Sequence, residues 1–144
     1  TNLNLQDTFQ NRINLIFFHI SFLFIRIKNS NKYNEYKDFQ QRMFDYIFDK
    51  IEINMRENGM GDVTVNKNMK FLVKAFYDIL LNCENYEKKN LDNKNIFILK
   101  HLDLTDKKKL NTTGLVDYFD KYRTFCLDLT LDKVLMGELN FSYK

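Results

Sequence analysis

The sequence predicts an all-α protein, a single compact domain of about five to six helices spanning residues 1–144. It has no proline and only four glycines in 144 residues, so few positions can break a helix. Hydrophobic residues make up 44% of the chain, including fourteen Phe and eight Tyr, which is enough for one core. Apolar residues also recur at helical spacing in several long segments, as shown below.

The first predicted helix, residues 13–27, reads INLIFFHISFLFIRI and is apolar on almost every side. Asp7 and Thr8 precede it as candidate caps. A membrane span needs about 20 apolar residues, and this run is shorter and is interrupted by Asn14, His19 and Ser21. We therefore predict a buried central helix, with His19 as a hydrogen-bonded core residue rather than a metal ligand.

The second predicted helix covers residues 33–55 and has a 3.6-residue apolar period. Acid-first pairs, such as Glu52 with Arg56, lie on the opposite, solvated face. The apolar stripe consists of Tyr36, Phe39, Met43, Phe44, Ile47, Phe48, Ile51 and Met55.

Residues 55–70, MRENGMGDVTVNKNMK, predict a short corner between two helices. Gly59 stands where a helix commonly ends on a residue with positive φ. Three residues are candidate caps for a third helix over residues 66–86: Asp62, Thr64 and Asn66.

On the third predicted helix, Lys67, Lys70 and Lys74 share one face. Such a face is usually solvated, but it can also dock a partner, and residues 107–109 are three further lysines that can extend it. The abundance of Phe and Tyr leaves room for an exposed apolar groove as well.

The remaining chain predicts three shorter helices. Residues 91–102 form one, and a second runs to Leu127 with Asn111 or Thr112 as its cap. Thr130 can start a last short helix over residues 131–136.

Sequence motifs for catalysis or cofactors are missing. His19, His101, Cys83 and Cys126 do not follow the spacing of a metal site, and both cysteines are predicted as core residues in a reducing compartment. The sequence contains neither GxGxxG nor GxxxxGK[ST]. A net charge of +3 is mildly basic and does not by itself indicate nucleic-acid binding. We expect no cofactor, no metal and no enzymatic activity.

The corner and its flanks resemble the ubiquinol-cytochrome c chaperone family, whose members show an LREMGVGDLxVxKxMKxxxxAFYGR-like run. The upstream residues Asp7, Thr8, Arg12, His19 and Arg26 also match, as do residues 115–119 and 131–141 nearer the C-terminus. The residues that match the central run are Met55, Arg56, Glu57, Gly59, Met60, Gly61, Asp62, Val63, Val65, Lys67, Met69, Lys70, Ala75, Phe76 and Tyr77.

The chain departs from the family pattern at a few positions. Asp78 and Ile79 replace a usual Gly-Arg pair, Asn58 stands where Met is common, and Asn66 occupies a frequent Pro position. We therefore do not expect this chain to make the contacts that the usual arginine makes in other members of the family.

The resemblance implies a non-enzymatic assembly chaperone for the cytochrome bc1 complex that binds newly made cytochrome b, with a small assembly partner and the ribosome as further partners. It also implies a peripheral location, on the cytoplasmic side of a bacterial inner membrane or in the mitochondrial matrix. We expect an apolar groove beside the corner and basic contacts to acidic or phosphate-bearing partners. The candidate partner-binding residues are Arg56, Gly59, Gly61, Asp62, Lys67, Lys70, Phe76 and Tyr77.

Two other readings stay open. One is a helical adaptor or ribosome-binding module with a different client, and the other is an enzyme or small-molecule binder with a closed polar pocket around His19 or His101. Because the chain begins at Thr1 rather than Met, we expect a trimmed or processed product, and targeting signals before Thr1 are not judged.

Overall fold

The computed structural model describes residues 5–30, 33–104, 112–130, 133 and 141. It confirms the all-α prediction. Among the described residues, β-type pairing is limited to an isolated antiparallel bridge between Leu5 and Leu104. The elements are α1 (Phe9–Lys28), α2 (Tyr33–Glu57), α3 (Asp62–Glu84), the 3₁₀ turn η1 (Tyr86–Lys88), α4 (Leu91–His101) and α5 (Thr113–Asp128).

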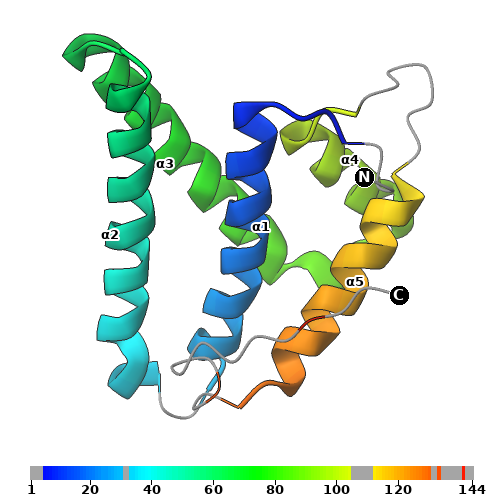
Figure 1. The fold of residues 1–144 in the computed structure, drawn as a ribbon. Coiled ribbons are helices and arrows are strands. Elements are labelled where there is room, and N and C mark those ends of the chain that lie inside the picture. The colour runs from blue at the N-terminus through cyan, green and yellow to red at the C-terminus, as the bar shows by residue number, and fades with distance from the viewer. Residues whose placement is uncertain (1–4, 31–32, 105–111, 131–132, 134–140, 142–144) are drawn as a thin grey trace.

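Helix α1 lies at the centre of the fold (Figure 1). It packs against α2, α3 and α5, while α4 packs against α5. Helices α2 and α3 meet at the corner and diverge away from it, forming a V whose open side is occupied by α1 (Figure 1). No helix among the described residues is long and apolar enough to cross a membrane.

Two neighbouring aromatic residues of α1 join the two halves of the core. The ring of Phe17 lies 5.4 Å from Phe48 of α2 and 5.3 Å from Phe76 of α3, measured between centroids. The ring of Phe18 stacks 4.8 Å from that of Phe119 on α5. Because successive residues of a helix point about 100° apart, adjacent positions reach opposite partners. This explains why the sequence of α1 is apolar on almost every side.

His19 is a half-buried residue whose two ring nitrogens both have partners. Nδ1 lies 2.6 Å from the carbonyl oxygen of Leu15, and Nε2 lies 2.6 Å from the hydroxyl of Tyr118. A carbonyl only accepts, so Nδ1 carries the hydrogen and Nε2 accepts from Tyr118. Burial lowers the pKa of His19 from its usual 6.5, which favours this neutral form. The prediction of a structural histidine is confirmed.

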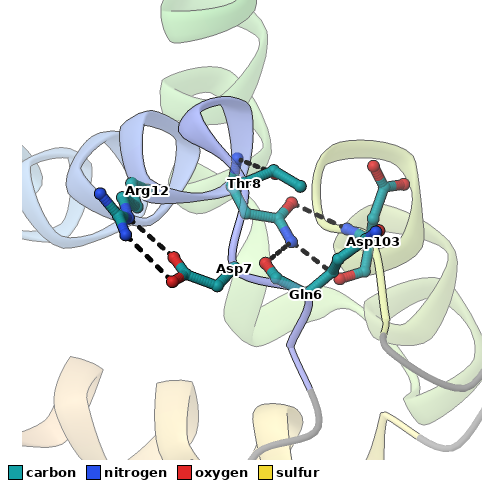
Figure 2. A network of polar contacts seen from close by, with 6 residues as sticks. Gln6, Asp7, Thr8, Arg12 and Asp103 are labelled. Atoms are coloured by element: carbon teal, nitrogen blue, oxygen red, sulfur yellow. Dashed lines mark hydrogen bonds and ion pairs between the residues drawn. The ribbon is translucent and has the colours of Figure 1, made fainter.

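The start of α1 is tied to the chain after α4, as Figure 2 shows. Thr8 caps the helix by accepting from the backbone N–H of Asn11, and Asp7 accepts two hydrogen bonds from Arg12. The amide of Asn11 donates to the carbonyls of Gln6 at 2.7 Å and Asp103 at 2.8 Å, and it accepts from the N–H of Asp103. One buried side chain thus connects two segments that are 92 residues apart.

Helix α5 begins at one of the two predicted cap residues but without the expected capping bond. Thr112 is the N-cap residue, but its side chain makes no capping bond and donates instead to the side chain of Asn95 on the preceding helix α4. Cys83 and Cys126 are buried free thiols whose pKa is raised by desolvation, as expected of core residues.

At the C-terminus, Thr130 accepts a hydrogen bond from the N–H of Lys133, as a cap would. The rest of the short helix predicted over 131–136, and the lysines at 107–109, lie outside the described residues.

We predict that Asn11→Ala lowers the free energy of unfolding by roughly 2–4 kcal/mol, because two carbonyls and one N–H lose their partner in a buried site. Asn93→Ala is the matched control, since Asn93 is exposed, and it should change stability by less than about 0.5 kcal/mol. Urea unfolding measures both. Equal losses in the two variants would contradict this account of Asn11.

We predict that stability falls as the pH drops below about 6.5, the usual pKa of histidine. His19 and His101 both have a lowered pKa in the folded state because they are buried, so the unfolded chain binds more protons in this range. The two neutral histidines therefore make their whole contribution to the free energy of unfolding above pH 6.5, and this contribution declines below that pH. Urea unfolding at several pH values should show a shallower decline for His19→Gln than for the wild type, and an identical decline would refute the assignment.

Candidate functional site

The corner between α2 and α3 is a Schellman turn. Gly59 has φ of +86°, its N–H donates to the carbonyl of Arg56 at 3.0 Å, and the N–H of Met60 donates to that of Met55 at 3.2 Å. Met55 is buried and Met60 packs against the same core, which is the apolar contact typical of this turn. The prediction of positive φ at Gly59 is confirmed.

Helix α3 begins earlier than predicted and with a different cap. Gly61 is the N-cap residue with extended backbone, and Asp62 is the first helical residue, whereas we expected Asp62, Thr64 or Asn66 to cap a helix starting near Asn66. The prediction was wrong because an N-cap needs an extended backbone more than a side-chain acceptor, and glycine also serves there. The carboxylate of Asp62 instead lies in the first turn, where the helix dipole favours an acid.

Arg56 links the two helices across the corner. Its guanidinium donates to Asp62 on α3 and, at 3.2 Å, to Glu52 on α2. These hydrogen bonds raise the pKa of Arg56 further. Both acids and the arginine are substantially exposed, so the cluster orients the corner more than it stabilises the fold.

The exposed side of α3 carries a row of cations between large apolar side chains. Lys67, Lys70 and Lys74 are all exposed, and no ion pair with another described residue is found for them. Val63 is 83% exposed and Phe71 is 62% exposed. We name this surface the α3 lysine face and define it as Val63, Lys67, Lys70, Phe71, Lys74, Tyr77 and Leu81.

Phe76 and Tyr77 point in different directions, although both were candidate contact residues. Phe76 is 2% exposed and packs against Phe17, Phe44 and Phe48, so it is a core residue that offers little surface to a partner. Tyr77 is 56% exposed. The structure thus places six of the eight candidates, from Arg56 to Lys70, on or near the corner, and Tyr77 further along α3.

A groove of mixed polar and apolar lining lies toward the open end of the V, whereas we expected an apolar groove beside the corner. Two adjoining hollows of about 140 Å³ and about 200 Å³ share Phe24, Gln40 and Leu80. Their walls come from α1, α2 and α3, because the V of α2 and α3 widens there around α1. We name this surface the V groove; it is lined by Phe24, Ile25, Lys28, Lys37, Gln40, Gln41, Phe44, Phe76, Tyr77, Leu80 and Glu84.

Each histidine borders a separate hollow. His19 and Tyr118 lie at one of about 500 Å³ between α1 and α5. His101 lies at one of about 450 Å³ between α1, α3 and α4, where its Nε2 is 2.7 Å from Asp78 and Lys100 is 3.0 Å from the same carboxylate. Both hollows are open to solvent, whereas a closed polar pocket around either histidine would favour the hypothesis of an enzyme or small-molecule binder.

The Asp78 cluster was not anticipated. Desolvation lowers the pKa of His101 below its usual value. Desolvation raises the pKa of Asp78, but the hydrogen bonds that Asp78 accepts from Lys100 and His101 outweigh this effect and hold its pKa below the usual value. Asp78 is half-buried, and the next residue, Ile79, is fully buried. Among the described residues, no group of His, Cys, Asp and Glu is arranged to hold a metal ion.

The two glycines of the corner allow a matched test, since a Cβ at either position meets nothing within 4 Å. We predict that Gly59→Ser destabilises the fold by about 1–2 kcal/mol because a side chain disfavours positive φ. Gly61→Ser should stabilise it by up to about 1 kcal/mol, since serine is a better N-cap and restricts the unfolded chain. Thermal unfolding measures both, and effects of the same sign would contradict the turn geometry.

Comparison with known proteins gives one family match. The model of the family described as ubiquinol-cytochrome C chaperone matches residues 1–94, about two thirds of the 144 residues. The matched stretch includes α1, the corner, α2 and α3, so it contains every wall of the V groove and the whole α3 lysine face. No curated protein and no solved structure matches significantly. The chain is a member of the ubiquinol-cytochrome c chaperone family.

Proposed function

We propose that the chain is a non-enzymatic assembly chaperone of the cytochrome bc1 complex that binds newly made cytochrome b in the V groove. The observation that carries this proposal is the family match, which covers the three helices that build the groove. A chaperone of this kind acts by holding its client and needs no bound nucleotide or metal. We place it on the cytoplasmic side of a bacterial inner membrane or in the mitochondrial matrix.

The walls of the V groove suit apolar side chains. Phe24, Phe44 and Leu80 supply apolar surface, and the ring of Tyr77 lies at its exposed edge. A hollow of about 140 Å³ equals the volume of roughly five molecules of liquid water, so it holds individual side chains and not a whole helix. We therefore propose that an apolar client segment lies along the surface and inserts one or two side chains.

One polar atom in the groove lacks a partner. The side-chain carbonyl oxygen of Gln40 is buried, and no described donor lies within hydrogen-bond distance of it. A buried acceptor without a partner costs free energy. Because this oxygen is closed to solvent, a donor from a client reaches it only after the Gln40 side chain rotates toward the groove.

A helical adaptor with a different client, including the ribosome, remains the competing function. It predicts that the same surface contacts ribosomal proteins even when no cytochrome b is made. The two functions therefore differ in which polypeptide touches the V groove.

We predict that a photo-crosslinking amino acid at Tyr77 or Gln41 captures cytochrome b in cells that are synthesising it, because both positions line the V groove. The same amino acid at Tyr46 is the matched control, since Tyr46 is 63% exposed on α2 but does not line the groove. Mass spectrometry of the adducts identifies the partner.

Cytochrome b adducts from the groove positions and not from Tyr46 support the proposal. Ribosomal adducts that persist without cytochrome b synthesis favour the adaptor. Absence of cytochrome b from all adducts, together with unchanged bc1 levels after gene deletion, overturns the chaperone function.

A further inference from the structure

The α3 lysine face differs in charge from the other long exposed helix surface. Residues 63–77 of α3 contain three lysines and no acid. The outer face of α2, by contrast, alternates acids and bases; its exposed charged residues are Lys37, Asp38, Arg42, Asp45, Asp49, Lys50, Arg56 and Glu57. A mixed face of that kind is ordinary solvated surface, whereas a face of one sign attracts a partner of the opposite sign.

The acids of α3 that flank the lysines are already engaged. Asp62 accepts from Arg56, and Asp78 binds Lys100 and His101. Lys67, Lys70 and Lys74 therefore repel one another along the helix without a described counter-charge. An anionic partner relieves this repulsion.

Large apolar side chains share this face with the lysines. At about 100° per residue, the three lysines fall in the same arc of roughly 80° as Val63, Tyr77 and Leu81, and Phe71 flanks it. Val63 is 83% exposed, Phe71 62%, Leu81 58% and Tyr77 56%. From Val63 to Leu81 the row is about 27 Å long. The ring of Tyr77 packs beside those of Phe44 and Phe76 and leaves its other side exposed.

We infer that the α3 lysine face docks on the anionic surface of a lipid bilayer. Lysine ammonium groups pair with lipid phosphates, while exposed Val, Phe, Leu and Tyr side chains enter the boundary between headgroups and acyl chains. An acidic peptide is a poorer fit, because peptide binding needs a groove along the row. The V groove includes Tyr77 and the hollow at His101 includes Phe71 and Lys74, so each hollow meets the row locally and does not follow it from Val63 to Leu81.

The position of Tyr77 shows what such docking achieves. Tyr77 belongs to the α3 lysine face and also lines the V groove. A bilayer that contacts the α3 lysine face therefore also meets the edge of the V groove. An apolar segment can pass there from the bilayer to the groove. This inference goes beyond the proposed function and does not depend on it, since a bilayer without protein tests it.

The experiment is flotation of the full chain with vesicles, one set of phosphatidylcholine alone and one with about a third phosphatidylglycerol. We expect tighter binding to the anionic vesicles, weakened by salt. The triple variant Lys67→Gln, Lys70→Gln, Lys74→Gln should bind on the order of a hundredfold more weakly, at about fivefold per lysine.

The matched control removes the same charge elsewhere, through Lys50→Gln, Lys88→Gln and Lys121→Gln on α2, η1 and α5. It should retain most of the binding. Phe71→Ser should weaken binding even at high salt, since its contribution is apolar. Circular dichroism checks that each variant keeps its helices.

Equal binding to both kinds of vesicle, or equal losses in the two triple variants, overturns the inference. The inference is also overturned if inorganic phosphate releases the chain from the vesicles at an ionic strength where chloride does not. That result would mean that the lysines bind free phosphate. The inference is also overturned if the triple variant Lys67→Gln, Lys70→Gln, Lys74→Gln loses binding to an acidic polypeptide but binds vesicles as well as the wild type does.

Discussion

The fold depends on one helix being buried from two sides at once. Phe17 of α1 packs against α2 and α3, while its neighbour Phe18 packs against α4 and α5, with ring centroids 4.8 to 5.4 Å apart. A single set of side chains therefore holds both halves of the molecule. Since α1 fills the open side of the V, it also sets how far α2 and α3 separate, and this separation creates the groove (Figure 1).

Such a helix must also satisfy the polar groups that it buries. Asn11 and Asn14 bond to backbone carbonyls near the end of α4, His19 bonds to Tyr118, and Arg26 donates to the carbonyl of Leu129 beyond α5. These bonds fix the rotation of α1 about its axis, which apolar packing alone specifies poorly. Several residues that resemble the family's upstream pattern thus hold the scaffold in place, and the surface for partners lies on α3. Ser21 is an exception, because its buried hydroxyl has no described partner.

Local features were predictable from the sequence and long-range ones were not. Helical periodicity located α2 and α3, an apolar run located α1, and Gly59 indicated positive φ, because these features depend on neighbouring residues. The contact of Asn11 with Asp103 and the widening of the V require the tertiary arrangement. Phe76 and Tyr77 show the limit at the site: adjacent residues point about 100° apart, and only packing decides which one is buried.

The central claim is that the V groove, held open by α1, receives cytochrome b. The most direct measurement is the amount of cytochrome b that co-purifies with the full chain when Leu80, which borders both hollows, is changed to Gln. Leu127→Gln is the control, because Leu127 is 41% exposed on α5. We expect a loss of about tenfold for Leu80→Gln and little change for the control, with helix content retained in both. Equal recovery of cytochrome b with the two variants would contradict it.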